Sequence, residues 1–293
     1  MQRFTGILLI AISAASFGTL AIFGRLLYAD GLDTFTLLFL RFSFAAVTMT
    51  FILLLRKEPL PRGKILLQLI GMGALGYAGQ SFSYLSAIKY ASAGLVALLL
   101  YLYPMCVFML SVIVLREKVT WIKIVALLLA LAGTALTVDP AGGQLTGILL
   151  AILSSVIYSI YIIVGTNIMK HVSAIQSSLV IFASAGVVFG GLMAVNGAHL
   201  PATGSGWLGI AGIVLVATVI PVTAFLAGLE RIGPTNASML STLEPVVTVL
   251  LAGLIFNERL QPITILGGIL ILVAVILLTR SEVKANLQEI RVD

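Results

Sequence analysis

Long stretches without a charged side chain constrain this sequence more than any other feature. No Lys, Arg, Asp or Glu occurs from Ile65 to Ile88, from Tyr90 to Leu115, or from Val172 to Leu229. Apolar residues make up 60% of the 293 residues and charged residues 10%, whereas soluble domains are about 25% charged. A helix of about 20 apolar residues crosses the hydrocarbon layer of a bilayer. The chain is therefore predicted to be an all-α membrane protein.

The apolar segments divide into ten predicted transmembrane helices. They are Gly6–Tyr28, Thr34–Leu55, Ile65–Ala87, Ser92–Leu115, Thr120–Val138, Leu145–Thr166, Ile175–Val195, Trp207–Gly228, Thr235–Phe256 and Ile263–Thr279. The first is longer than the apolar part of a signal peptide and further spans follow it, so we expect it to be retained.

Lysine and arginine residues fall mostly on one side of this topology. The side with both termini carries Arg3, Arg56, Lys57, Arg62, Lys64, Arg116, Lys118, Lys123, Lys170, Arg231, Arg280, Lys284 and Arg291. The other side carries Arg25, Lys89 and Arg259. The positive-inside rule then places both termini in the cytoplasm, as in a bacterial-type inner membrane. The basic charge is a topology signal, and the short loops on that side offer no domain for nucleic acid.

Few residues could support metal, redox or nucleotide chemistry. Cys106 is the single cysteine, so no internal disulfide can form. His171 and His199 lie on opposite sides of the predicted membrane and cannot share a metal. The chain also lacks the glycine-rich G-x-x-x-x-G-K-[ST] phosphate loop. We expect no metal and no cofactor, and any pumping would need a solute or ion gradient.

The second half of the chain repeats the first at one constant shift in residue number, which we call the repeat shift. It aligns Gly6 with Gly147, Ser13 with Ser154, Phe17 with Tyr158, Pro104 with Pro245 and Glu117 with Glu258. Each half has five predicted spans, so the second half enters the membrane in the opposite orientation. The predicted units are a first five-helix repeat (1–139), an inverted second repeat (140–280) and a cytoplasmic tail (281–293). Secondary transporters place their substrate site between such repeats.

Two blocks of sequence resemble a known family. The first comprises Gln80–Gly94, Leu102-Tyr103-Pro104 and Glu117, and the second comprises Phe225–Ser238, Leu243-Glu244-Pro245 and Glu258. These blocks are similar to those of the EamA-type drug/metabolite transporters, and within that family to a group of amino-acid exporters. The resemblance covers the whole chain. It implies a basket of ten helices in two inverted five-helix repeats, alternating access, and export of small metabolites or amphipathic compounds.

Glu244 is the most unusual residue of the predicted spans. It is the tenth residue of Thr235–Phe256, which places it about 14 Å along the helix and near the middle of the membrane. A carboxylate there costs several kcal/mol unless it is protonated, paired or in contact with water. Ser241 and Thr248 share its helix face by spacing. This face is predicted to form a substrate or proton site; the alternative is a protonated glutamate that locks the spans together.

Aromatic and polar side chains on other spans could line the same site. They are Phe17 of the first span, Tyr77, Gln80 and Tyr84 of the third, Tyr101 of the fourth, and Ser154, Tyr158 and Tyr161 of the sixth. Tyrosine rings with serine between them suit an amino acid or a flat apolar solute. Ordinary packing between helices is the alternative for each of them.

Three prolines and one arginine complete the candidate residues. Pro104, Pro221 and Pro245 fall within spans, where each removes a helical hydrogen bond and predicts a hinge or a static kink. Pro245 would leave the Ser241 carbonyl exposed. Arg41 lies inside the second span. We expect a fixed structural partner for Arg41, with an ion pair to Glu244 or a substrate carboxylate as alternatives.

The functional prediction is an inner-membrane secondary transporter. It would export small amphipathic metabolites, with amino acids as the favoured class, through a central cavity between the repeats. An exporter of lipophilic cations with the same fold is the alternative, and a membrane-embedded enzyme is disfavoured because no catalytic cluster is evident. The expected partners are a small-molecule substrate, the lipid bilayer and protons. The small-residue pair Gly186 and Gly190 predicts close helix packing, within a monomer or across a homodimer.

Overall fold

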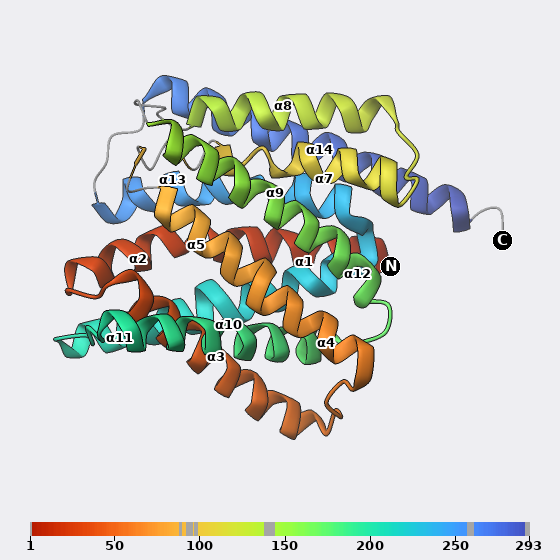
Figure 1. The fold of residues 1–293 in the computed structure, drawn as a ribbon. Helices are drawn as coiled ribbons and strands as arrows, with labels where there is room; N and C mark the ends of the chain where they lie inside the picture. Colours follow the sequence, from red (N-terminus) through yellow and green to blue (C-terminus); the bar gives the residue numbers. More distant parts are fainter. Residues whose placement is uncertain are drawn as a thin grey trace.

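In a computed structural model the chain forms a bundle of α-helices (Figure 1). The structure describes residues 2–87, 90–91, 96, 99–137, 144–256 and 261–290. The helices of the first half are α1 (Gln2–Phe17), α2 (Leu20–Ala29), α3 (Thr34–Arg56), α4 (Gly63–Gly71), α5 (Ala78–Ala87), α7 (Tyr103–Val114) and α8 (Trp121–Thr137). Those of the second half are α9 (Leu145–Ile168), α10 (Ala174–Asn196), α11 (Gly204–Val214), α12 (Ile220–Leu240), α13 (Leu243–Phe256) and α14 (Pro262–Ile290). Two π-helical segments, η1 (Met72–Tyr77) and η2 (Leu215–Val219), join α4 to α5 and α11 to α12.

Seven helical stretches of the described residues are long and apolar enough to cross a membrane. They are Gln2–Ala29, Thr34–Arg56, Gly63–Tyr84, Leu145–Ile168, Ala174–Asn196, Gly204–Leu240 and Pro262–Ser281. Three shorter apolar helices occur at Tyr103–Val114, Trp121–Leu136 and Leu243–Ile255. These ten regions overlap the ten predicted spans, although Gly204–Leu240 contains the predicted eighth span together with the start of the ninth. Because three of them are short, the all-helical membrane fold is confirmed, while the count of ten spans stays a prediction.

Helices related by the repeat shift pack against one another. Helix α3 lies beside its equivalent α10, and α8 lies beside its equivalent α14 (Figure 1). Figure 1 shows these two pairs on opposite sides of the bundle. The contact of α1 with α12 likewise has an equivalent in the contact of α9 with α5. The π-helical segments correspond as well, since the repeat shift places the start of η1 close to the start of η2. The two-repeat architecture predicted from the sequence is therefore confirmed.

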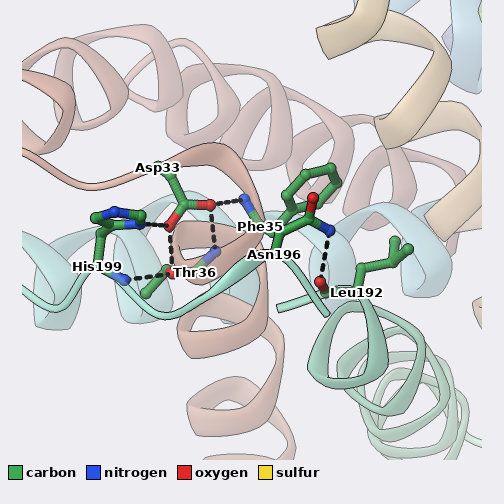
Figure 2. A network of polar contacts seen from close by, with 6 residues as sticks. All are labelled: Asp33, Phe35, Thr36, Leu192, Asn196 and His199. Atoms are coloured by element: carbon green, nitrogen blue, oxygen red, sulfur yellow. Dashed lines mark hydrogen bonds and ion pairs between the residues drawn. The ribbon is translucent and has the colours of Figure 1, made fainter. Parts of the chain in front are cut away.

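The pair α3 and α10 runs antiparallel, as two copies of one helix must in an inverted repeat. The Asp33 side chain caps the start of α3 by accepting from the backbone amides of Phe35 (2.8 Å) and Thr36 (3.1 Å). His199, which follows the end of α10, lies 3.2 Å from the same carboxylate through Nδ1 and donates its amide to Thr36 Oγ1 (3.0 Å) (Figure 2). At the other end Ser173 caps α10 and hydrogen-bonds Glu58, which follows α3.

Glycines of α10 allow this pair to approach closely. A Cβ atom added to Gly186 would lie 3.1 Å from Ser43 Oγ, and one added to Gly190 would lie 3.1 Å from the Phe39 ring. Both neighbours are on α3. The predicted close packing of Gly186 and Gly190 is thus made within one chain.

Glu117 lies in the loop between α7 and α8 and connects the two repeats. Its carboxylate binds Lys123 Nζ through one oxygen and accepts a hydrogen bond of 2.6 Å from Thr235 Oγ1 through the other. Thr235 belongs to the second repeat, beside the kink at Gly233 in α12, where φ is 76°. The equivalent glutamate, Glu258, lies outside the described residues.

Helix α14 continues into the segment predicted as a tail. It ends at Ile290, so residues 281–290 are helical and the last three residues lie outside the described part of the chain. The predicted boundary between the repeats, at residues 139 and 140, also lies outside that part. The assignment of the tail to the cytoplasm stays a prediction.

Candidate functional site

The predicted ninth span is broken immediately before Glu244. Helix α12 ends at Leu240, Ser241 and Thr242 form a turn, and α13 starts at Leu243. Glu244 is therefore in the first turn of a helix rather than in the middle of one. The partial positive charge at a helix N-terminus favours a carboxylate in that position. The expectation of one helix through Glu244, interrupted by Pro245, was wrong, because the chain breaks at Ser241–Thr242, ahead of the proline.

Two of the three prolines lie in the first turn of a helix. Pro104 is the second residue of α7 and Pro245 the third of α13. The first turn of a helix does not use its amide donors internally, so proline is tolerated there. Pro221 is the second residue of α12, but α12 continues directly from η2, so this proline lies within a continuous helical stretch and cannot donate to the carbonyl one turn earlier. The prediction that Pro245 exposes the Ser241 carbonyl was wrong, because that oxygen accepts a 3.0 Å bond from the Glu244 amide. A hinge function for these prolines stays a prediction.

The predicted first span is also broken, and its break meets α13. Helix α1 ends at Phe17 and α2 begins at Leu20. Thr248 Oγ1 donates a hydrogen bond of 3.0 Å to the freed carbonyl of Gly18. A Cβ atom at Gly18 would lie 2.7 Å from Val247 Cβ. A glycine is therefore needed for this close approach, which places the two helix breaks next to each other.

Five tyrosines form a continuous arc of ring contacts through the centre of the bundle. The ring centroids of Tyr77 and Tyr161 are 5.7 Å apart, and those of Tyr161 and Tyr158 are 5.9 Å apart. Tyr158 then meets Tyr103 edge-on at 4.8 Å, and Tyr103 lies 6.5 Å from Tyr101. We call these five residues the tyrosine arc. Its members come from η1, α9 and the region around the start of α7, so both repeats build it.

Glu244 and Arg41 both lie beside the tyrosine arc. Tyr101 is close to the Glu244 carboxyl, and Tyr77 is close to the Arg41 guanidinium. Arg41 and Glu244 are close enough for their charges to interact. Arg41 is buried, whereas Glu244 keeps part of its surface accessible. The arrangement places opposite charges beside one amphipathic aromatic wall.

Arg41 has fixed partners on η2 of the other repeat. Its Nε donates to Thr218 Oγ1 at 2.6 Å and its Nη2 donates to the Ala217 carbonyl at 3.3 Å. Its Cζ lies 5.0 Å from the centroid of the Phe42 ring. The Ala217 carbonyl is available because Pro221, one helical turn later, has no amide hydrogen to donate to it. Arg41 is therefore positioned by neutral groups.

The predicted hydroxyl-bearing residues mostly donate to backbone oxygens. Ser154 donates to the Gln80 carbonyl at 3.0 Å, Ser241 to the Ala237 carbonyl at 2.9 Å, and Thr248 to Gly18 as described. The Ala237 carbonyl also accepts from the Ser241 amide at 3.0 Å, whereas Gly18 lies at a helix break, where a freed carbonyl needs another donor. These hydroxyls support the walls of the site, and a direct role in substrate binding stays a prediction.

The structure places the remaining predicted residues at the edge of this region. Tyr84 on α5 is partly buried and lies close enough to Glu244 for an electrostatic interaction. Gln80 is partly buried, and its side-chain oxygen accepts a 3.3 Å bond from Ser81. Phe17 packs against the core without a ring contact to the tyrosine arc among the described residues. Their roles as lining residues stay predictions.

The residue prediction missed Tyr103 and Thr218. Tyr103 joins Tyr158 to Tyr101 in the tyrosine arc, and Thr218 holds Arg41. The repeat contained a signal for Tyr103, because the repeat shift aligns it with Glu244. No comparable signal marks Thr218, whose contact depends on the packing of α3 against η2.

Two inverted sets of apolar helices around a central acid define the class of this protein as a multi-pass membrane transporter. The sequence profile of the EamA-like transporter family matches residues 4–139 and, separately, residues 145–280. The chain belongs to the EamA-like transporter family, with one match in each repeat.

Relatives and a solved structure agree with this assignment. The "Uncharacterized transporter" of Archaeoglobus fulgidus is 29% identical over 279 residues, which cover 92% of this chain and 95% of that protein. "Uncharacterized transporter YcbK" of Bacillus subtilis is 24% identical over 276 residues, covering 89% and 88%. A crystal structure of 21% sequence identity covers 94% of this chain and 98% of its own with a TM-score of 0.83, which shows the same fold. The relatives are named as transporters and not as enzymes.

Proposed function

We propose that this transporter exports small amphipathic metabolites, with amino acids as the favoured class, by alternating access between its two repeats. The observation that carries this proposal is the position of Glu244. It lies at a helix start, partly accessible, beside an arc of tyrosines supplied by both repeats. Tyrosine rings offer apolar faces and polar hydroxyls to a solute of mixed character.

Glu244 has two chemical uses in this proposal. An acid in the middle of a membrane protein can exchange a proton during the transport cycle or bind the ammonium group of a solute. Breaks beside it, at Gly18 and at Ser241–Thr242, allow helix halves on each side to move separately. Discontinuous helices of this kind are a common feature of substrate sites in secondary transporters.

The test is transport by Glu244→Gln in proteoliposomes. Uptake of amino acids by counterflow is expected to fall about tenfold and to lose its dependence on pH, because the variant can neither ionise nor pair with an ammonium group. Glu230→Gln is the matched control, since Glu230 is an exposed glutamate whose carboxylate lies 3.8 Å from Arg231. Unchanged transport by Glu244→Gln at every pH would remove Glu244 from the mechanism.

Export of lipophilic cations is the second candidate function. A carboxylate beside tyrosine rings can also bind a quaternary ammonium group, through charge and through cation–π contact. Competition assays distinguish the two candidates. Inhibition of counterflow by a quaternary amine, with amino acids ineffective, would favour the cation exporter.

We further propose an inner-membrane location with both termini in the cytoplasm. The support is the excess of lysine and arginine on that side of the predicted topology. The test begins by replacing the single cysteine, Cys106, with alanine. New cysteines at Arg62 and at Gly197 are then labelled with an impermeant maleimide. Gly197 is expected to react in intact cells, and Arg62 after permeabilisation. The reverse pattern would invert the topology.

A further inference from the structure

Arg41 carries a buried positive charge that its partners do not neutralise. The side chain is 5% exposed. Among the described residues no carboxylate oxygen lies within 4.0 Å of it, and the groups that hold it, Thr218 and Ala217, are neutral. A guanidinium has five N–H donors, of which these two bonds use two and the Tyr77 hydroxyl can take a third. A buried cation with spare donors is costly unless an anion joins it.

The second repeat shows that the fold does not need this charge. The residue equivalent to Arg41 under the repeat shift is Phe182, which is fully buried. Its ring stacks on Phe42 with centroids 6.4 Å apart. The same comparison applies to Glu244, whose equivalent is the buried Tyr103. At both positions one repeat has a neutral aromatic residue where the other has a charge.

The two charges that have no charged counterpart in the other repeat also lie beside the same tyrosine arc. They are close enough to interact, yet they make no ion pair with each other within 4.0 Å in the described part of the chain. Tyr77 stands beside Arg41 and Tyr101 stands beside Glu244. Opposite charges beside one aromatic wall, without an ion pair between them, match a solute that carries an anionic and a cationic group on one apolar frame.

We propose that Arg41 is a specificity-determining residue that binds the anionic group of the transported solute while Glu244 receives its cationic group. This inference rests on the proposed function. It explains why the site would bind zwitterions in preference to solutes that carry only a positive charge. The contacts with Thr218 and Ala217 fix the direction of the guanidinium, and its spare donors form bonds to a carboxylate. A site with Glu244 alone would accept an amine with or without that carboxylate.

Three solutes with the same ring test this proposal. Phenylalanine carries both charges, phenylalanine amide lacks the carboxylate, and 3-phenylpropanoate lacks the ammonium group. Binding to the purified full-length protein is measured by calorimetry, which avoids leakage of the amide across liposomes. The wild type is expected to bind phenylalanine about tenfold or more tighter than either analogue, since each analogue leaves either Arg41 or Glu244 without a group of opposite charge.

Arg41→Gln is expected to weaken phenylalanine binding about tenfold and to leave amide binding within about threefold of the wild type. If Arg41 had only a structural role, its replacement would weaken the binding of phenylalanine and of phenylalanine amide equally. Arg41→Lys keeps the charge and is expected to recover part of the preference for phenylalanine. Arg41→Phe copies the residue of the other repeat, so it provides a second variant if Arg41→Gln does not fold. Arg231→Gln is the control, because Arg231 contacts the Ala227 carbonyl and the exposed Glu230.

The outcomes separate this inference from the proposed function. Equal affinity of the wild type for phenylalanine and its amide, unchanged in Arg41→Gln, would overturn the role of Arg41 and leave the transport proposal standing. Binding of none of the three solutes by the wild type would count against both. Tighter binding of the amide than of phenylalanine would favour the exporter of lipophilic cations.

Discussion

The hydroxyl of Ser13 in α1 donates a hydrogen bond of 2.8 Å to the carbonyl oxygen of Pro221 in α12. The repeat shift converts this pair into Ser154 and Gln80, which form the same bond at 3.0 Å. The first helix of each repeat is therefore packed into the other repeat. The repeats are interlocked, so a motion that opens the centre must move helices of both.

We expect Ser13→Ala and Ser154→Ala each to lower the free energy of unfolding by about 1 kcal/mol, because each removes a hydrogen bond between the two repeats. Thermal unfolding in detergent, followed by helicity, measures the effect. Thr50→Ala is the control, since the exposed Thr50 hydroxyl donates only to the Ala46 carbonyl of its own helix, at 2.8 Å. Equal midpoints for all three variants would contradict the importance of the interlocking bonds.

A glycine pair distinguishes close helix packing from ordinary helix propensity. A Cβ atom at Gly73 in η1 would lie 2.5 Å from the Ile181 carbonyl oxygen, which is backbone and cannot turn away. We expect Gly73→Ala to destabilise the protein by about 2 kcal/mol or more. Gly191→Ala, in α10 with nothing within 4 Å of the added atom, should be neutral or stabilising by up to about 1 kcal/mol. Similar unfolding midpoints for the two variants would refute the predicted contact.

Two tyrosines of the arc should respond oppositely to loss of their hydroxyl. The Tyr161 hydroxyl is buried without a hydrogen-bond partner, so Tyr161→Phe should leave stability unchanged or raise it by up to about 1 kcal/mol. The Tyr77 hydroxyl lies within reach of Arg41, so Tyr77→Phe should lower stability by about 1 kcal/mol. Thermal unfolding of both variants is the measurement. Loss of transport in Tyr161→Phe with unchanged stability would indicate that this hydroxyl binds the solute.

The loop between α2 and α3 should give the protein an acid-dependent contribution to stability. Burial acts to raise the pKa of Asp33, but hydrogen bonds from Thr36, Phe35 and His199 outweigh it and hold the pKa below the usual 3.8. A depressed pKa means that this contribution is present above about pH 4 and is lost as the pH falls through the folded-state pKa.

Asp33→Asn tests that contribution, because asparagine keeps the helix cap and removes the charge. At pH 6, Asp33→Asn is expected to have a lower unfolding midpoint than the wild type. This difference should shrink towards pH 3. Asp33→Ala also loses the cap and should cost about 1 kcal/mol more at pH 6. A constant difference across this pH range would rule out titration of Asp33 as the cause.

Much of the candidate site could be predicted before any coordinates. Tyr77, Tyr158 and Tyr161 are candidates because they lie on single faces of apolar segments, and the structure brings all three into one set of ring contacts. Glu244 is a candidate because an acid is costly in such a segment, and it lies beside that set of rings. Helical spacing and hydrophobicity are local properties, so the residues of one helix face can be read from the sequence.

The helix breaks and the partners of Arg41 could not be predicted in this way. The proline at position 245 suggested an interruption, but the turn falls at Ser241–Thr242 because the Ser241 carbonyl finds the Glu244 amide there. Thr218 holds Arg41 because a π-helical segment turns its hydroxyl towards α3. The contact of Arg41 depends on segments that are far apart in the chain, and the position of the break depends on α13 meeting the first span at Gly18.

The sequence by itself determined the membrane-spanning character, the order of the apolar segments and the repeat shift that relates the halves, because these follow from composition and repetition along one chain. Tertiary structure decided that the first helix of each repeat packs into the other and that Arg41 and Glu244 lie beside one tyrosine arc. The physical reason is that lipid-exposed and protein-buried faces of an apolar helix look alike in composition. Close packing, set by small residues and backbone hydrogen bonds, then selects the partner helix.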